Sequence, residues 1–264
     1  MKKYWEIIKI SFKAQIAWRF DVAMTMVFTI TKILFAYILW GAVYNQRETV
    51  AGFTFQTMLA YYVVNAFLSQ IEMSDGVSGE VSGRIRGGTF SKYMVIPANV
   101  QGYFMAQSAG VTAFYLLFSL LAAVLWQVLF RIPFIYTRDG GVILSAVVLV
   151  LMGLFFMVQL NYFLGILTFK FQDIGLFLMI KSHFTAFVTG TLIPLVLLPE
   201  NVQLVMRAFP FYYVSYLPSM LLIGEKGEEI LTGLAVLGGW IIFFSAVNRL
   251  MYKRLRVRYD GVGI

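Results

Sequence analysis

Six long apolar stretches constrain this chain more than any other feature of its sequence. They lie at about 22–43, 53–71, 103–130, 142–169, 174–198 and 230–250. A bilayer core of about 30 Å is crossed by a helix of about 20 apolar residues, and a backbone in lipid must form its hydrogen bonds within itself. The sequence therefore predicts an all-α integral membrane protein with six transmembrane helices, folded as one transmembrane domain over residues 1–264.

Composition supports a membrane protein over a soluble one. The chain is 60% hydrophobic and only 13% charged, whereas soluble domains carry about 25% charged residues. The net charge of +8 resides mostly at the ends of the apolar stretches, where cations favour anionic lipid headgroups. We therefore expect membrane lipids, and not nucleic acid, to be the partners of these basic residues.

The distribution of Lys and Arg predicts the orientation of the chain. An even number of spans places both termini on one side, and the side richer in cations is cytoplasmic. Fourteen cations share the side of the termini: Lys2, Lys3, Lys9, Lys13, Arg19, Arg84, Arg86, Lys92, Lys170, Arg249, Lys253, Arg254, Arg256 and Arg258. Five lie on the other side: Arg47, Arg131, Arg138, Arg207 and Lys226. Both termini are thus predicted to be cytoplasmic, in a multi-pass protein of the cell membrane.

The first 19 residues form an element of their own. Aromatic and aliphatic side chains recur at helical spacing, at Tyr4, Trp5, Ile8, Phe12 and Ile16, while the lysines point largely elsewhere. This pattern is typical of an amphipathic helix that lies in the membrane interface. Simple anchoring explains it, and docking of a cytoplasmic partner is the alternative.

Catalytic and metal-binding motifs are missing from the sequence. It has no cysteine and a single histidine, His183, which argues against disulfides, thiolate sites and a zinc site of the usual spacing. It also lacks the G-x-x-x-x-G-K-[ST] loop that cradles nucleotide phosphates. We expect no cofactor and no catalytic residue in this chain, and if ATP drives it, another subunit must bind the ATP.

Polar side chains within the predicted spans are few. They are Lys32, Asn65, Gln107, Gln159, Asn161, Lys181 and His183. Ionisable groups at membrane depth usually face the bundle interior or water, so Lys32, Asn65, Lys181 and His183 are candidates to line a translocation path. The alternative is structural: a lysine that snorkels or pairs, and a histidine satisfied by packing.

The inner loop, residues 72–99, contains a short predicted helix. Val77, Val81 and Ile85 recur every fourth residue and form one apolar face, with Glu80, Arg84 and Arg86 off that stripe. Gly88 is well placed to end the helix. A compact charged helix at the cytoplasmic face is suited to receive force from a soluble motor, although a plain interfacial connector would also be amphipathic.

The outer segment, residues 199–229, is too proline-broken to cross the membrane as one helix and too apolar for a free loop. Its aromatic residues are clustered around Pro210 and Pro218, and they are Phe209, Phe211, Tyr212, Tyr213 and Tyr216. The sequence predicts short helices or a re-entrant turn at the outer face, buried against the spans.

Two motifs resemble a known family. "EVSGRIRGGTFSKYMVIP", residues 80–97, resembles the loop between the second and third spans of type-2 ABC transporter permeases, with Glu80, Ile85, Arg86, Gly88 and Pro97 in matching places. Met94 stands where leucine is usual. "FPFYYVSYLPSMLLIG", residues 209–224, is similar to the string before the last span of these permeases. The likeness covers essentially the whole chain.

The resemblance implies the permease subunit of a six-span ABC exporter. Two such permeases, identical or related, would face each other above two copies of a cytoplasmic ABC ATPase that binds ATP and Mg. The coupling helix would include Glu80, Val81, Arg84, Ile85, Arg86 and Gly88, which would insert into a groove of the ATPase. Substrate would move outward between the first, second and fifth spans, and the aromatic outer segment would act as the outer gate.

Two other classes compete with this interpretation. A stand-alone channel or secondary carrier is expected to have membrane-embedded acids or paired interrupted spans, and neither is convincing in this sequence. A scaffolding protein without transport would leave the inner helix with no motor to serve.

Overall fold

A computed structural model describes residues 2–130, 135–191 and 193–259. Arg131, one of the predicted outer cations, and Leu192, in the fifth predicted span, lie outside the described residues. Across the described part of the chain every regular element is helical, apart from an isolated bridge between Val50 and Phe53. The all-α prediction is confirmed for these residues.

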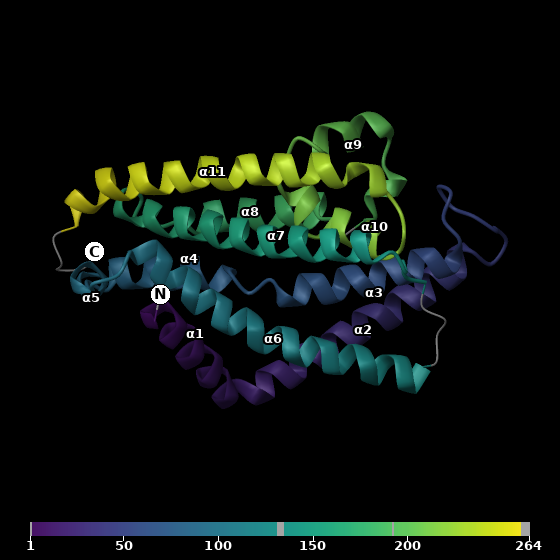
Figure 1. Ribbon diagram of the computed structural model, residues 1–264, viewed down its shortest axis with the longest axis horizontal. Coiled ribbons are helices and arrows are strands. Elements are labelled where there is room, and N and C mark those ends of the chain that lie inside the picture. The colour runs from purple at the N-terminus through teal and green to yellow at the C-terminus, as the bar shows by residue number, and fades with distance from the viewer. Residues whose placement is uncertain (1, 131–134, 192, 260–264) are drawn as a thin grey trace.

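The helices are laid out along one long axis (Figure 1). The long ones are α2 (Arg19–Val43), α6 (Val100–Phe130), α7 (Gly140–Ile166) and α11 (Ile230–Leu255), and the shorter ones are α1 (Lys2–Ala14), α3 (Phe55–Ile71), α4 (Asp75–Arg86), α5 (Ser91–Val95), α8 (Gly175–Val188), α9 (Glu200–Met206) and α10 (Leu217–Leu222). The start of α1 and the end of α11 lie at the same end of the molecule as α4 and α5, whereas α9 and α10 lie toward the other end.

Four helical segments of the described chain are long and apolar enough to cross a membrane. They are Lys2–Val43, Val100–Val124, Gly140–Phe169 and Gly227–Leu255. Two further predicted spans are shorter helices: α3 has 17 residues and α8 has 14, which correspond to about 26 and 21 Å of helix. The structure thus shows a membrane protein with long and short apolar helices.

The prediction of one continuous fifth helix over 174–198 is wrong. The helix α8 ends at Val188, and Gly190 follows with φ of 72°. The chain turns there over Tyr61, whose hydroxyl donates to the Gly190 carbonyl oxygen over 3.1 Å. A Cβ at Gly190 would lie 2.3 Å from that hydroxyl, so the turn needs glycine both for its conformation and for its space.

The helix α7 forms the centre of the bundle. It contributes a long row of buried side chains and packs against α11, α4 and α10. Two of its glycines allow close approach: a Cβ at Gly153 would lie 3.0 Å from Val214 Cα, and a Cβ at Gly165 would lie 2.7 Å from Val81 Cβ. Small residues at such crossings let helices meet where lipid provides no hydrophobic driving force.

The N-terminal helix α1 is confirmed, and it is packed more closely than an isolated anchor would be. It lies against α6, where a Cβ at Gly110 would come within 2.4 Å of the Ile8 carbonyl oxygen, and Phe12 meets Phe114 edge-on with ring centroids 5.3 Å apart. A short 3₁₀ turn, Gln15–Trp18, joins it to α2 at an angle (Figure 1). Trp5 stays 56% exposed, so an outward apolar face remains.

The outer segment is broken into short elements, as predicted. After α9 the chain forms a π-helical turn, Tyr212–Tyr216, which leads directly into α10. Pro218 lies in the first turn of α10. These elements form much of the main hydrophobic core with α7 and α3.

Candidate functional site

The inner helix α4 is held against α7 by its apolar stripe. Val77, Val81 and Ile85 are at most 5% exposed and lie in one hydrophobic cluster with Ile166 and Phe169. Gly165 provides the space that Val81 fills. The predicted apolar face of α4 is therefore confirmed, and it is buried within the bundle itself.

The helix α4 begins within the bundle, beside α7, and not beyond the end of that helix. Its first residue, Asp75, accepts a hydrogen bond from Asn161, which precedes the end of the α7 segment at Phe169 by eight residues, or about 12 Å of helix. The helix then runs alongside the last turns of α7. Residues 72–86 are thus an interrupted continuation of α3, and only the later part of the inner loop extends past α7.

Gly88 ends α4, as its position in the sequence predicts. Its φ is 69°, a conformation that favours glycine. The Gly88 amide donates to the Ile85 carbonyl over 3.2 Å and the Thr89 amide donates to the Arg84 carbonyl over 2.9 Å. This is the Schellman arrangement, which satisfies the last carbonyls of a helix and turns the chain toward α5.

Glu80 connects three elements at the inner end. Its carboxylate accepts from the Tyr93 hydroxyl over 3.0 Å and from Gln107 Nε2 over 2.6 Å, so it joins α4 to α5 and α6. Arg84 lies 3.5 Å from the same carboxylate. Burial, reinforced by the negative charge of Glu80, raises the pKa of Tyr93 to about 12. Glu80 is therefore engaged by contacts within this chain.

The free surface of this region lies on the opposite face of α4 and on α5. Gly76, Gly79 and Gly83 are exposed, and a Cβ added at any of them would meet nothing within 4 Å outside the backbone of α4. Arg86 is exposed beside them, and Val95, at the end of α5, is 82% exposed. Among the six predicted coupling residues, Val81 and Ile85 are buried anchors, and Arg86 is available to a partner.

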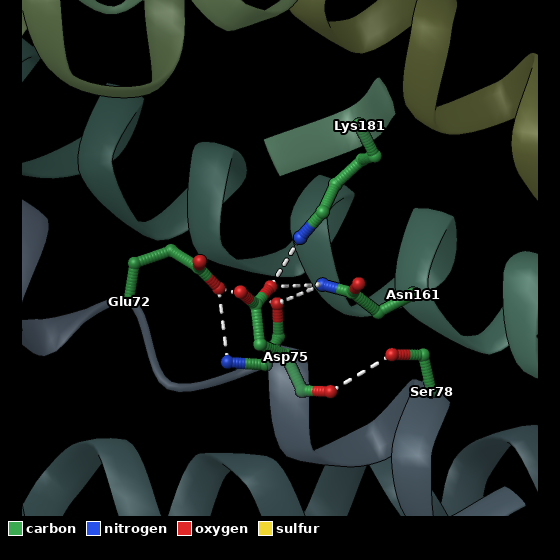
Figure 2. Close-up of polar contacts among 6 residues, drawn as sticks. Glu72, Asp75, Ser78, Asn161 and Lys181 are labelled. Carbon is green, nitrogen blue, oxygen red and sulfur yellow. Dashed lines mark hydrogen bonds and ion pairs between the residues drawn. The ribbon is translucent and has the colours of Figure 1, made fainter. Parts of the chain in front are cut away.

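A polar cluster links α4 to α8 and α7 (Figure 2). The Lys181 ammonium of α8 pairs with Asp75 Oδ1. Asn161 of α7 donates to Ser74 Oγ over 2.6 Å and to Asp75 Oδ1 over 3.3 Å. The Lys181 side chain is only 9% exposed, whereas that of Asp75 is 67% exposed. Val188 is the one buried residue of α8, and this cluster connects the middle of that helix to α4.

Glu72 lies beside this cluster in the connection between α3 and α4. Its Oε1 accepts from the Ser74 amide over 2.9 Å and from the Ser74 hydroxyl, while Figure 2 shows its other oxygen without a drawn contact. Burial raises the pKa of this carboxyl, and the charge of Asp75 adds to the effect. Its hydrogen bonds to Ser74 and the more distant charge of Lys181 only partly oppose that shift.

The four predicted path residues fall into two groups. Asn65 is buried and donates to the Thr189 carbonyl over 3.2 Å, and Lys181 lines a small cavity close by. Lys32 and His183 lie on exposed faces of α2 and α8, and His183 Nδ1 lies 2.8 Å from the Met179 carbonyl oxygen. The structure brings the first two to one region and leaves the other two on the outer surface.

Four of the five predicted outer-gate residues form packed core, and the fifth, Phe209, is partly buried against that core. Tyr212, Tyr213 and Tyr216 are at most 1% exposed and Phe211 is 8% exposed. The Tyr212 hydroxyl donates to Glu229 over 2.8 Å, and Arg207 pairs with the same carboxylate at 3.0 Å. The packing therefore shows no freely moving lid among these residues.

Sequence reasoning missed Glu72, Asp75 and Ser215 as members of a polar site. Glu72 and Asp75 flank the predicted border of a span, where charges are ordinary, and Ser215 lies within an aromatic run. The only local signal was the pair of acids directly after an apolar stretch. Across the described residues no group of three or more His, Cys, Asp or Glu side chains is placed to hold a metal ion.

The sequence of this chain matches one protein-family model. The family model described as "ABC-2 family transporter protein" matches residues 29–263. Comparisons with curated proteins and with solved structures returned no match. Because the match spans nearly the whole chain, including the polar cluster and the inner helix, this chain belongs to the ABC-2 transporter family and is the non-catalytic membrane permease component of such a transporter.

Proposed function

We propose that this permease is driven from its inner end by a separate cytoplasmic ABC ATPase and exports its substrate. Two permease copies, identical or related, and two ATPase copies would form the transporter. The six apolar stretches would each cross or enter the membrane, with both termini cytoplasmic. The asymmetry of fourteen inner against five outer cations supports this orientation, as does the position of the start of α1 and the end of α11 at one end of the molecule.

The observation that carries the proposal is the anchoring of α4. A buried stripe fixes α4 to α7, and Glu80 ties it to α5 and α6, so force applied to this end reaches three elements together. The exposed part nearby, Arg86 with Lys92 and Val95, combines cations and an apolar tip. In this proposal these outward residues contact the ATPase, while Val81 and Ile85 transmit the force.

The polar cluster offers a route from the motor to the substrate path. Asp75 is the first residue of α4, and its partner Lys181 is in α8. Since α8 has little buried surface of its own, a small displacement of α4 would move it. The exposed apolar faces of α2 and α8, with Lys32 and His183 on them, would face the second permease copy across the path.

Co-purification tests the proposal. The permease with an affinity tag is extracted from its own host in mild detergent, and the proteins that accompany it are identified by mass spectrometry. We expect an ATPase with a P-loop in stoichiometric amount, and we expect the double variant Arg86→Glu, Val95→Asp to lose it while the permease remains folded. Arg138→Glu, on the predicted outer side, is the matched control and should retain it. A permease that never brings an ATPase would instead favour a channel or secondary carrier.

A further inference from the structure

The polar cluster borders a small cavity that the proposed coupling route does not use. The cavity has a volume of about 150 Å³ and lies between α3, α7, α8 and the π-helical turn. Its polar lining includes Ser69, Glu72, Asp75, Lys181, Thr185 and Ser215. Ser182 and Thr191 on its rim are exposed, so the cavity opens to the surface beside α8.

The charges around the cavity do not balance. Asp75 and Lys181 form a pair, and Asn161 takes part in their network. Glu72 receives hydrogen bonds from Ser74 alone among the described residues, and no cation pairs with it there. A partly buried carboxylate without a counter-charge is unfavourable, so this site has a demand for one positive charge.

Two residues that line this cavity, Thr185 and Ser215, have hydroxyl groups without a hydrogen-bond partner among the described residues. Ser215 is only 4% exposed, and its Oγ has no hydrogen-bond partner among the described residues. The Thr185 hydroxyl is in the same situation. Buried polar groups in folded proteins are almost always hydrogen-bonded. Two unpartnered hydroxyls on lining residues of one cavity therefore favour an occupant that offers donors once these side chains rotate toward it. Ser215 lies in a π-helical turn, an element that is frequent at functional sites.

We propose that this cavity binds the ammonium group of an amphipathic cation. The charge of a primary ammonium would neutralise Glu72, whose free oxygen would accept one N–H. The hydroxyls of Ser215 and Thr185 would accept the other N–H groups after rotating toward the cavity. The volume admits the ammonium and its first carbons, and the apolar remainder of the molecule would extend from the rim along the exposed apolar face of α8. This assignment rests on the proposed transport function for its physiological meaning, since it names the class of molecule that the permease would carry or hold.

Binding of hexylammonium to the purified permease alone tests the assignment. Equilibrium dialysis with radiolabelled hexylammonium is compared with hexanol and hexanoate at neutral pH. We expect one site for the amine and at least about tenfold weaker binding of the alcohol, because the charge-assisted hydrogen bonds are lost. Equal binding of hexanol would overturn the proposal, since it would show general apolar partitioning.

Variants locate the site. Glu72→Gln should weaken hexylammonium binding at least about tenfold, and Ser215→Ala should weaken it several-fold. Glu228→Gln, an exposed carboxylate in the outer segment, should change nothing. Folding is checked by size-exclusion chromatography, and Ser215→Ala carries the test if Glu72→Gln does not fold. Unchanged binding in the folded variants would remove this cavity as the site.

Competition with lipid nanodiscs distinguishes a lipid headgroup from a free amine as the source of the ammonium. The design of the assay also keeps this test independent of the test for an ATPase partner. If nanodiscs rich in phosphatidylethanolamine block hexylammonium binding and phosphatidylglycerol nanodiscs do not, the occupant is a lipid headgroup. If neither lipid competes, it is a free amine. The assay contains no ATPase, so failure to find an ATPase partner would leave its result unchanged, and a negative result here would leave the ATPase test unchanged.

Discussion

Asp75, the first residue of α4, and Lys181, in the middle of α8, form an ion pair across 106 positions of sequence. The pair is asymmetric, because the lysine side chain is 9% exposed and the aspartate side chain is 67% exposed. Loss of Asp75 therefore leaves a largely buried cation unpaired, whereas loss of Lys181 leaves a mostly solvated anion unpaired.

Asp75→Asn is accordingly expected to destabilise the permease more than Lys181→Met does. An unpaired buried ammonium costs on the order of 2–3 kcal/mol, while a buried methionine in place of the paired lysine is close to neutral. Thermal unfolding in detergent measures both variants. Equal losses would mean that the ammonium reaches water in the absence of Asp75. In the assembled transporter, both changes should reduce transport per ATP hydrolysed.

Gly165→Ala should destabilise the contact between α7 and α4. Its new methyl group would lie 2.7 Å from Val81 Cβ, and overpacking of this kind typically costs about 1–3 kcal/mol. Gly239→Ala in α11 is the matched control, since nothing lies within 4 Å of its added methyl and alanine favours helix by up to about 1 kcal/mol.

The double variant Gly165→Ala, Val81→Ala gives a second check on this contact. The smaller side chain at position 81 should restore part of the stability lost by Gly165→Ala alone. If the stability losses of Gly165→Ala and Val81→Ala simply add in the double variant, the clash between the new methyl group and Val81 is not the cause of the loss in Gly165→Ala. The midpoint of thermal unfolding is the common measurement for all three variants.

Stability should fall as pH rises through the titration of Glu72. Burial raises the pKa of this carboxyl above its ordinary value near 4.5, so the folded state binds a proton over a range in which the unfolded state has released it. The proton's contribution to stability is complete below the unfolded pKa and is lost as pH rises through the folded one. Asp75 and Lys181 are the charged groups that influence this carboxyl.

Glu72→Gln should remove that part of the pH dependence and raise stability at neutral pH. The amide keeps an oxygen for the Ser74 amide hydrogen bond and carries no charge to bury. Unfolding midpoints between pH 4.5 and 8, with Glu228→Gln as the control, measure the effect. An unchanged pH profile in Glu72→Gln would assign the dependence to another group.

Glu80→Ala should loosen α5 without unfolding the bundle. The change leaves the Tyr93 hydroxyl and the Gln107 amide without their shared acceptor, which costs on the order of 1–3 kcal/mol locally. Hydrogen exchange in residues 89–97 should accelerate, while exchange in α7 stays slow. Arg86→Ala, whose side chain is exposed, is the control and should leave both segments unchanged.

The inner helix α4 shows which structural features can be predicted from the local sequence alone. The Val77–Val81–Ile85 stripe and the stop at Gly88 follow from helical periodicity and from the conformational freedom of glycine, and both are found as predicted. The depth of α4 in the bundle does not follow from them. It depends on Gly165, 84 positions after Val81, which permits the two helices to meet so closely.

The fifth stretch shows the opposite case. Its apolar composition over 174–198 predicts one crossing helix, yet the chain leaves the helix after Val188. Gly190 and Pro194 were visible in the sequence, but glycine and proline are common in transmembrane helices. The turn over Tyr61 is a contact with another helix, and composition carries no information about it.

Sequence by itself determined that this chain is a helical membrane protein, which ends of its spans are cationic, and which face of the inner helix is apolar. These properties depend on composition and on spacings within a single element. Tertiary structure alone decided that Asp75 meets Lys181, that Glu72 is left without a cation among the described residues, and that Ser215 lines the same cavity as these residues. Such meetings depend on the register between helices far apart in the chain, and that register is set by the packing of small and large side chains at each helix crossing.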